Sequence, residues 1–461
     1  MLNERSPPCQ NLKGGFPYAS LYRAFAFALT LPSMTLSADI VKEGVVGKVD
    51  YTETKWFSVD HYKRNIPLIT GDVLDLDDLE NNVAWLNRNP FQYTEILLSP
   101  GKSAGTSDVH FATKERFPWQ FYAGVDNTGT RYTDPIRLMA GFNWGNFFGT
   151  ADQFSFQFTA SPDFHRFKSY LIDYTAYLPW QHELNIYSSY GSIHPKISDV
   201  HKEGKNVQAS LRYLIPFKPF FTDLKHQLTW GLDYKWINSN LFYLSNRMLP
   251  LTTQPVTITQ AMLGYRLDYE KNHTHLTFDL ECYGSPVSFL PHQSDHDYQR
   301  LRSGSQAQYF YGKSALGVTY RFAEKMQLAF LVRGQASTKA LLVSEQFGLG
   351  GYDTVRGYQE RAFNADNAVC FNGEFRTPPI SFMDNCKDHF SLLGFVDAAY
   401  GRNYDKESGV PSQQWLLGVG PGVRYDIGTY LTTRLDYGFQ LHHIFGDHHA
   451  GRIHFSLIVS Y

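Results

Sequence analysis

The fold class is decided by the segment Leu228-Thr229-Trp230-Gly231-Leu232-Asp233-Tyr234-Lys235-Trp236, in which large apolar residues occupy every second position. Successive side chains of a β-strand point to opposite faces, so this strand has one apolar and one polar face. The segments 276–281 and 431–441 alternate in the same way. About sixteen such strands follow Trp119, and no helix is expected among them. Strands with one face toward lipid and one toward a wet lumen predict an all-β transmembrane barrel, antiparallel and even-numbered.

Composition agrees with a membrane barrel and argues against several other functions. The chain has 461 residues, of which 16% are aromatic, and its formal net charge is -2. A nearly neutral chain offers no bulk electrostatic attraction for nucleic acid. No run of about eighteen apolar residues lies downstream of the N-terminal segment, so no helical membrane span is expected. No Ser-His-Asp or Cys-His arrangement can be placed, and we therefore expect neither an enzyme nor a cofactor.

The connections between the expected strands alternate in length. Counted from Trp119, the connections after even-numbered strands are mostly tight, as at Gly428-Thr429. The connections after odd-numbered strands are longer, at 194–204, 239–255, 287–307 and 339–365. Short periplasmic turns and long outer loops give this parity in outer-membrane barrels, whereas a soluble β-sandwich does not predict it.

The N-terminal part of the chain differs from the barrel region, which we place at 118–461. Residues 1–38 are interpreted as an export signal peptide, because Lys13 and Arg23 precede a short apolar run and small residues follow it. Residues 39–117 are predicted to form a small α+β domain with the order β-α-α-β-β.

One helix of this small domain is predicted in particular detail. Asp75 is a suitable N-cap, and Leu76, Leu79, Val83 and Leu86 then recur at helical spacing on one face. Two strands are predicted on either side of a turn at Pro100-Gly101. The resulting sheet would have one edge available for pairing.

A Gly-rich segment interrupts the strand pattern within the connection 339–365. It contains Gly348-Leu349-Gly350-Gly351 and then Val355-Arg356-Gly357-Tyr358. An arginine beside a glycine and an aromatic residue, between membrane-type strands, indicates a loop that folds inward into the barrel. The segment lacks the Lys-Ser/Thr pair of a phosphate-binding P-loop, so no nucleotide site is predicted.

Three motifs in order resemble the haemolysin secretion/activation type of two-partner-secretion transporters, which combine POTRA domains with a barrel. Residues 350–360 match the VRGY loop of that family, and Gly394-Phe395-Val396-Asp397 matches its FxDxG strand motif, with Ala399 in place of the usual glycine. Residues 70–80 and 98–108 resemble the barrel-proximal POTRA domain. In our count the VRGY loop joins strands 11 and 12 and Asp397 lies on strand 13, as in the family.

The resemblance implies a site inside the barrel. Arg356 is expected to pair with Asp397 and so hold the loop against the wall, while Gly357 allows a tight turn and Tyr358 packs the tip. Alternation alone does not place Asp397, because the apolar Phe395 two residues earlier would be expected to face lipid. The residues carried over are Val355, Arg356, Gly357, Tyr358 and Asp397, with Phe395 and Glu374 in the strands beside them.

The implied function is an outer-membrane pore that secretes a partner polypeptide, unfolded in the periplasm, through a monomeric barrel surrounded by lipid. The POTRA-like domain would bind that partner as an added strand. The residues expected near this binding edge are Leu76, Leu79, Pro100 and Gly101. Members of the family normally carry two POTRA domains and a plug helix, whereas this chain has room for one POTRA domain before the barrel.

Several alternatives stay open from the sequence. The VRGY loop also fits an outer-membrane protein insertion factor, and a passive channel is a further possibility. Cys370 and Cys386 could pair or remain free thiols. Two histidine clusters in predicted outer loops could bind zinc or copper, but we interpret them as solvated and predict no metal site. The clusters are His292 with Asp295, His296 and Asp297, and His442, His443, His448 and His449.

Overall fold

The computed structural model describes the chain from residue 44 to the C-terminus, apart from short gaps. The described residues are 44–196, 203–219, 221, 223–238, 241–244, 247–250, 255–286, 288–322, 325–383, 387–404, 411–444 and 449–461. The predicted signal peptide, 1–38, lies outside them. Two compact units are distinguished, one of Met1–Gln120, Phe142–Ser155 and Asp173–Asn185, the other of Phe121–Gly141, Phe156–Ile172 and Ile186–Tyr461.

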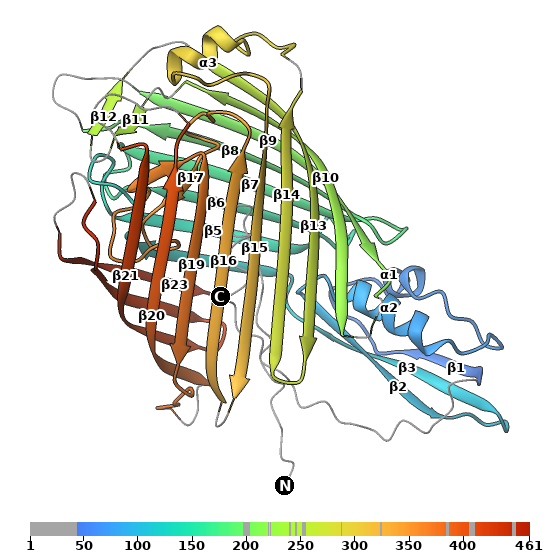
Figure 1. Cartoon of the computed structure of the whole chain (residues 1–461). Coiled ribbons are helices and arrows are strands. Elements are labelled where there is room, and N and C mark those ends of the chain that lie inside the picture. The colour runs from blue at the N-terminus through green and yellow to red at the C-terminus, as the bar shows by residue number, and fades with distance from the viewer. Residues whose placement is uncertain are drawn as a thin grey trace. The chain divides into compact units, whose positions relative to one another are not determined.

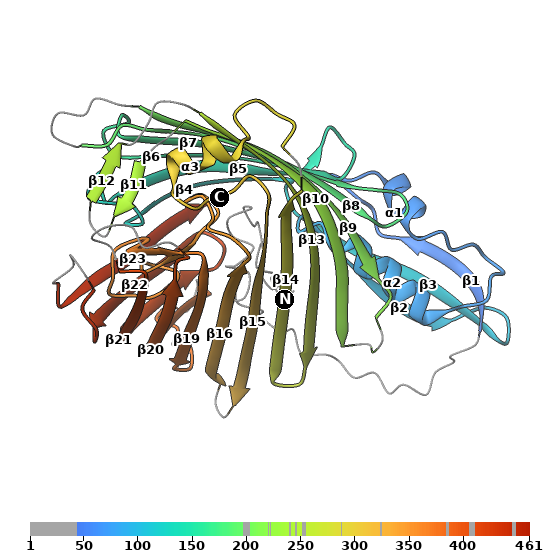
Figure 2. The same cartoon turned by 45° about the horizontal axis from the view of Figure 1, so that its top comes forward.

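Sixteen antiparallel strands close into a barrel, as predicted. In order around the ring they are β4 (Trp119–Asp126), β5 (Arg137–Phe147), β6 (Asp152–Ala160), β7 (Phe167–Tyr177), β8 (Glu183–Ile193), β9 (Gly204–Phe217), β10 (Leu224–Ile237), β13 (Val256–Lys271), β14 (Thr274–Ser285), β15 (Tyr309–Phe322), β16 (Met326–Ser337), β19 (Asn367–Arg376), β20 (Asp388–Arg402), β21 (Gln413–Ile427), β22 (Leu431–Gln440) and β23 (Gly451–Ser460). Figures 1 and 2 show neighbouring strands running side by side around this ring.

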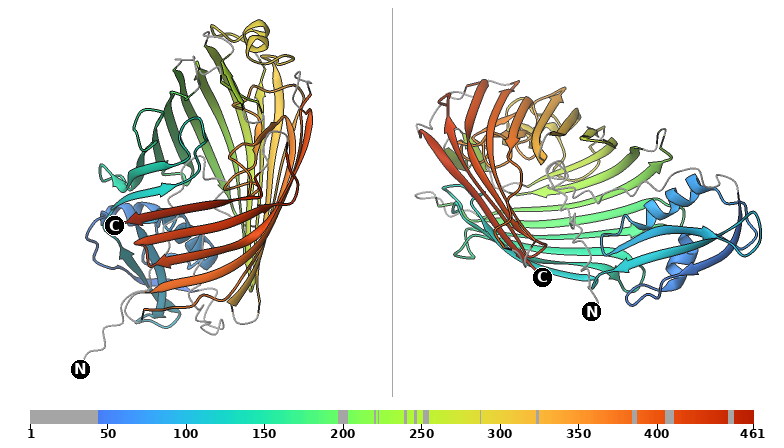
Figure 3. Two further views of the ribbon diagram at one scale, coloured as in Figure 1. Left: turned by 90° about the vertical axis from the view of Figure 1, so that its left-hand side faces the viewer. Right: turned by 90° about the horizontal axis from the view of Figure 1, so that it is seen from below.

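The alternation read from the sequence determines which side chains face outward. In β10, Trp230, Leu232 and Tyr234 are exposed, whereas Gly231 and Asp233 between them are buried. The pattern places the bulky apolar residues on the outer face and the small or charged residues on the inner face, as a lipid-facing strand requires. Figure 3 shows the C-terminal strands, in orange and red, as one continuous wall of the barrel.

The parity of the connections is also observed. Tight turns join β13 to β14 and β21 to β22, whereas long segments join β14 to β15 and β16 to β19. The β14–β15 segment contains a short helix, α3 (Asp295–Leu301), and the β16–β19 segment contains a small hairpin, β17 (Phe347–Leu349) with β18 (Phe363–Ala365). Another hairpin, β11 (Leu241–Leu244) with β12 (Arg247–Pro250), lies between β10 and β13. Figure 1 shows α3 and the β11–β12 hairpin at the end of the barrel opposite the β13–β14 turn.

The expectation of no helix after Trp119 is therefore wrong at α3. Ser294 caps this helix through a reciprocal capping box with Asp297, and Tyr298 and Leu301 are buried beneath it. A capped turn of this kind needs no long helical period in the sequence, because two local side-chain hydrogen bonds and a small apolar contact define it. None of the helices in the described part of the chain is both long and apolar enough to cross a membrane.

The ring closes between the first and last strands of the barrel. The pairing of β23 with β4 spans five residue pairs, from Ser456 opposite Asp126 to Ser460 opposite Tyr122. Beyond this ladder, the backbone N–H of Phe121 and the carbonyl of Tyr461 form a hydrogen bond of 2.9 Å. For comparison, β20 and β21 pair along the whole length of β20.

An N-terminal module, residues 44–117, has the predicted β-α-α-β-β order. It contains β1 (Val45–Tyr51), α1 (Val59–Asn65), α2 (Leu76–Leu86), β2 (Gln92–Pro100) and β3 (Thr106–Glu115), with β3 in the middle of the sheet. Asp75 caps α2 as expected, its carboxylate accepting the backbone N–H of Asp78. The apolar face of α2 packs into a buried core with Tyr62, Phe91 and Phe111.

Candidate functional site

The inward loop, residues 339–365, folds back so that its central residues are buried. Gly350 and Gly351 adopt φ values of 96° and 105°, which residues with a Cβ rarely adopt. The chain turns at these two glycines, shortly before the VRGY segment. Val355, Arg356 and Tyr358 are 0%, 2% and 0% exposed. The predicted inward loop is therefore present, and its VRGY segment lies among inner-face residues of β19 to β23.

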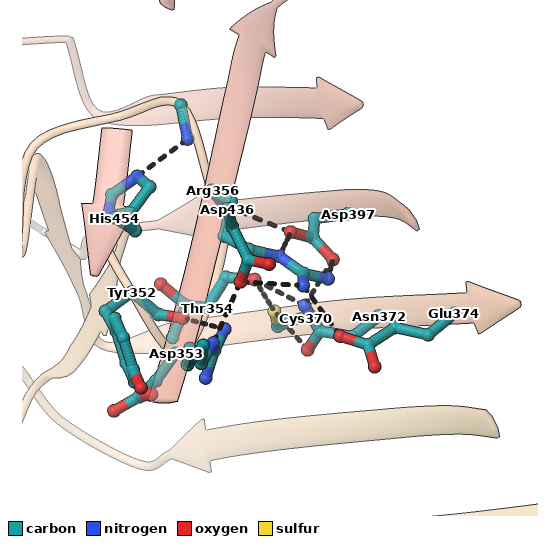
Figure 4. Close-up of polar contacts among 12 residues, drawn as sticks. Tyr352, Asp353, Thr354, Arg356, Cys370, Asn372, Glu374, Asp397, Asp436 and His454 are labelled. Atoms are coloured by element: carbon teal, nitrogen blue, oxygen red, sulfur yellow. Dashed lines mark hydrogen bonds and ion pairs between the residues drawn. The ribbon is translucent and has the colours of Figure 1, made fainter. Parts of the chain in front are cut away.

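Arg356 lies at the centre of a buried polar network. Its Nε and one terminal nitrogen donate to the two carboxylate oxygens of Asp397 at 2.7 and 2.8 Å, the bidentate geometry that matches a guanidinium to a carboxylate. The backbone N–H of Arg356 also donates to Asp397 at 3.1 Å. The other terminal nitrogen donates to Glu374 at 2.6 Å. Figure 4 shows the guanidinium enclosed by these acceptors.

The structure decides the orientation of Asp397 that alternation left open. Phe395 and Asp397 are 4% and 0% exposed, whereas Val396 between them is 47% exposed on the outer face. Phe395 thus faces inward despite its apolar character. The guanidinium carbon of Arg356 lies over the ring of Phe395, 3.5 Å from the ring centroid, in a cation–π contact. A loop cation thus accounts for an aromatic residue on the polar face of the strand.

The charges around Arg356 form a wider network of ion pairs. Glu374 also pairs with Arg376 at 2.6 Å. Asp436 pairs with Arg424 at 2.6 Å and with Arg434 at 2.8 Å, and it lies 3.4 Å from Arg356. Buried charges are tolerated only when they are paired and hydrogen-bonded, because desolvation is costly. Removing one member would therefore leave several buried partners incompletely satisfied.

The tip of the loop is held by the barrel wall through backbone contacts. The N–H of Gly357 donates to Nε2 of His454 at 3.0 Å, and its carbonyl accepts from Gln440 at 2.8 Å. The hydroxyl of Tyr358 lies within hydrogen-bonding distance of the carbonyl oxygens of Leu417 and His442, and it accepts the backbone N–H of Leu417. Because the two bonds of Gly357 fix backbone atoms of the loop, they determine the position of its main chain and not only that of its side chains.

A second buried ion pair holds the two ends of the inward loop. Arg302, just after α3, donates to both carboxylate oxygens of Asp366, where the loop meets β19. The same arginine donates to the carbonyl of Leu341 near the start of the loop and to Asn403 in the next outer connection. The two side chains of the pair are 5% and 0% exposed. The α3 segment is thus tied to both ends of the loop.

The structure brings together the residues that the sequence assigned to the inward loop and its partner strands, and it adds others. Val355, Arg356, Gly357, Tyr358, Glu374, Phe395 and Asp397 all belong to this one site. The residues that were missed are Asn372, Arg434, Asp436, Gln440 and His454. A signal was present for three of them, since Arg434, Asp436 and Gln440 occupy the polar face of an alternating strand. Which residues of that face contact the loop depends on the path of the loop inside the barrel, which the alternation of the strands does not specify.

The residues predicted near the partner-binding edge of the N-terminal module have different surroundings. Leu79 is 3% exposed and belongs to the core, with Leu76 packed against it. Their side chains are therefore occupied in holding α2 on the sheet, and not free to contact a partner. Pro100 is exposed at the end of β2, and Gly101 follows it in the turn toward β3.

The cysteines and histidine clusters raised as open questions lie partly within the described residues. Cys370 is a buried free thiol, while Cys386 lies outside the described residues. Asp295 accepts the backbone N–H of Ala307, and Asp297 belongs to the capping box of α3. Across the described ranges no three His, Cys, Asp or Glu side chains come together as a metal-binding group, and His448 lies outside those ranges.

Comparison with known proteins gives relatives among outer-membrane transporters. The chain is 22% identical over 371 residues to the outer membrane transporter CdiB of Dickeya dadantii, an alignment that covers 77% of this chain and 63% of the relative. It is 24% identical over 427 residues to the heme/hemopexin transporter protein HuxB of Haemophilus influenzae, covering 87% of this chain and 71% of the relative. The chain thus spans less than two thirds of the length of the CdiB relative.

Solved structures show the same fold. CdiB from Escherichia coli superimposes with a TM-score of 0.74 at 18% identity, covering 91% of this chain and 77% of that chain. BamA from Haemophilus ducreyi, solved without its POTRA domains 1–3, gives a TM-score of 0.55 at 13% identity, covering 90% and 84%. The family described as haemolysin secretion/activation protein ShlB/FhaC/HecB matches residues 105–425, which include the inward loop and its partners on β19, β20 and β21. With a match over most of its length and the same barrel, the chain belongs to the haemolysin secretion/activation protein family.

Proposed function

We propose that this protein is the pore of a two-partner-secretion system, which passes an unfolded partner polypeptide through its lumen. A barrel of this family lies in the outer membrane of a Gram-negative cell. The observation that carries the proposal is the inward loop, held across the interior by the Arg356–Asp397 ion pair. Neither the motifs nor the site suggests a reaction, so the role proposed is transport without catalysis.

The loop explains how such a pore is closed at rest and opens when a partner polypeptide enters. An extended polypeptide needs the interior space in which Val355, Arg356 and Tyr358 are now buried. The contacts that hold the loop are ion pairs and hydrogen bonds, which an incoming chain can replace with polar contacts of its own. Because no nucleotide site is predicted, folding of the partner outside the cell would provide the direction of transport.

The N-terminal module, which we propose to be a POTRA domain, would receive the partner first. In the described module, β3 is the only strand neighbour of β2. On the other edge of β2, the Asn87 side chain bonds both the N–H and the carbonyl of Thr94, so an added strand would pair with the part of β2 that follows Thr94. Pro100 marks the end of that edge, since proline has no N–H to donate. Pairing through the backbone would bind an unfolded chain without requiring one particular sequence.

A secretion assay with an Arg356→Ala variant tests this proposal. The chain is expressed with a candidate secreted protein encoded beside it, and the partner is measured in the medium. We expect secretion to be lost while the barrel still inserts and keeps its heat-modifiable mobility. Arg321→Ala on β15 is the matched control, since Arg321 pairs with Glu270, outside the inward loop. Undiminished secretion by Arg356→Ala would exclude the loop as a required part of the transport mechanism.

A second candidate function is the insertion of other outer-membrane proteins, for which the short β23–β4 pairing provides a possible opening. The two functions make opposite predictions for a disulfide across this pairing, between Val125→Cys and Leu457→Cys, which lie opposite one another. Secretion through the lumen should continue when the seam is cross-linked. Insertion that uses the seam should stop, and should recover when the disulfide is reduced.

A further inference from the structure

We propose that Gly418 on β21 and Gly438 on β22 form a glycine seat, a flat patch of inner wall that positions the tip of the inward loop. The inference rests on the proposed role of that loop in closing the pore. Both glycines lie on the buried face of their strands. They are positioning residues, because they act through Arg356 and Gly357 and need not touch the transported chain.

The seat exists because the backbone of the loop comes closer to the wall than any side chain would permit. A Cβ atom built on Gly438 would overlap the backbone nitrogen of Gly357 and lie 2.5 Å from the carbonyl carbon of Arg356. A Cβ on Gly418 would overlap the carbonyl oxygen of Arg356 and lie 3.4 Å from a methyl group of Val355. The obstructing atoms nearest to each position are backbone, so no rotation of a flexible side chain can relieve the overlap.

The contact is reciprocal at the tip of the loop. Gly357 has a φ of 99°, and a Cβ there would lie 2.9 Å from the carbonyl oxygen of Gly438. Gly357 of the loop therefore meets Gly438 of the wall, whereas Gly418 faces the backbone of Arg356. The turn at Gly357 requires the left-handed conformation, whereas the wall glycines lie in regular strands and are needed only for the space they leave.

The seat fixes the distance on which the ion pair depends. Along the inner face of β22, Asp436, Gly438 and Gln440 follow one another at every second position. The first lies 3.4 Å from Arg356, the second contacts the loop backbone, and the third donates to Gly357 at 2.8 Å. A displacement of about 1 Å would lengthen the bonds from Arg356 to Asp397 beyond hydrogen-bonding range.

Other glycines of the barrel provide matched controls. A Cβ on Gly394, in β20, would meet no atom within 4 Å, and one on Gly312, in β15, would lie 3.7 Å from its nearest neighbour, a backbone oxygen. Both lie in barrel strands, so an alanine at either position tests the general cost of replacing a strand glycine. Alanine at Gly394 or Gly312 should leave the loop in place.

The test compares pore opening in the full-length chain carrying Gly438→Ala, Gly418→Ala, Gly394→Ala or Gly312→Ala. Open probability is measured in planar bilayers, and trypsin cleavage at Arg356 reports whether the loop has left its buried position. Overpacking of this kind should raise the open fraction by roughly ten- to a hundredfold for the two seat variants. The two control variants should match the unmodified protein.

A double-mutant comparison separates positioning from a general effect on the barrel. If the seat acts through the loop, Gly438→Ala added to Arg356→Ala should open the pore no further than Arg356→Ala alone. Additive opening, or a Gly438→Ala variant that behaves like Gly394→Ala, would overturn the proposal. If Arg356→Ala itself leaves opening unchanged, it is the proposed function of the loop that fails.

A folding defect in Gly438→Ala is resolved in a chain that lacks residues 353–358. Without the tip of the loop there is no backbone for the new methyl group to strike, so the substitution should then be tolerated. Recovery of the heat-modifiable barrel supports the seat. Failure to fold in both backgrounds assigns Gly438 to the barrel wall alone and overturns the proposal.

Discussion

Replacing Asp397 with asparagine should open the resting pore. The carboxylate of Asp397 accepts two bonds from the Arg356 side chain, one from the Arg356 backbone and one from Asn372 at 2.8 Å. Asparagine keeps the shape of the side chain but removes its charge. It also directs an amide N–H₂ group toward donors, so at least one bond of the bidentate pair is lost.

The size of the effect follows from the burial of the pair. Breaking a buried ion pair by removing one partner costs about 3–5 kcal/mol. The lower end applies here, because Arg356 keeps its contact with Glu374 at 2.6 Å and remains near Asp436. About 3 kcal/mol corresponds to a shift of roughly 100- to 200-fold in the equilibrium between the docked and undocked loop.

Single-channel recording in planar bilayers measures that shift directly, as the ratio of open to closed time. Uptake of an antibiotic too large for the closed barrel gives an independent measure in cells. Asp279→Asn is the matched control, since Asp279 pairs with Arg266 between β13 and β14, outside the inward loop. A folded Asp397→Asn barrel whose open fraction equals that of the control would refute the claim that this ion pair holds the loop.

Three further predictions concern other parts of the chain. Arg302→Ala leaves the carboxylate of Asp366 buried without its cation, so hydrogen exchange at both ends of the inward loop should rise by about two orders of magnitude or more, while exchange in β13 is unchanged. Tyr358→Phe removes the hydroxyl that bonds β21, and the loss of about 1 kcal/mol should raise the open fraction less than tenfold. An open fraction higher than that of Asp397→Asn would contradict the expectation that the ion pair holds the loop more strongly than this hydroxyl. In the N-terminal module, burial and, to a smaller extent, the charge of Arg64 lower the pKa of His61 to about 4, while the charge of Asp152 acts in the opposite direction. Because the unfolded chain then binds a proton more readily than the folded module, the module should lose stability as the pH falls from about 6.5 to 4. Neutral His61 is favoured by the fold, hence His61→Gln should remove this loss, as measured by hydrogen exchange corrected for intrinsic rate.

Much of the barrel could be predicted because its determinants are local. In β10, a strand with two faces, large apolar residues alternate with small or charged ones, and the apolar residues face outward. The outward residues are Trp230, Leu232 and Tyr234, and those between them are Gly231 and Asp233. Strand number and the parity of the connections follow once these segments are counted. The helix α3 escaped prediction because it has only seven residues and begins at a local capping box of Ser294 and Asp297, so a helical period has little length in which to appear.

The candidate site divides differently between sequence and structure. The sequence determined by itself that an arginine between glycines and an aromatic residue interrupts a run of membrane-type strands, and the family resemblance supplied Asp397 as its partner. Only the tertiary structure decided that Phe395 faces the arginine, that Asp436 and His454 join the site, and that Gly418 and Gly438 leave room for the loop backbone. The physical reason is that alternation fixes the face on which a side chain lies, and chain order makes β19 to β23 neighbours, whereas the path of the loop through the interior decides which wall residues it meets. A glycine in a strand has no side chain that contributes to the alternation of apolar and polar residues. Its role in packing is therefore recognised only when the structure shows another backbone in the space beside it.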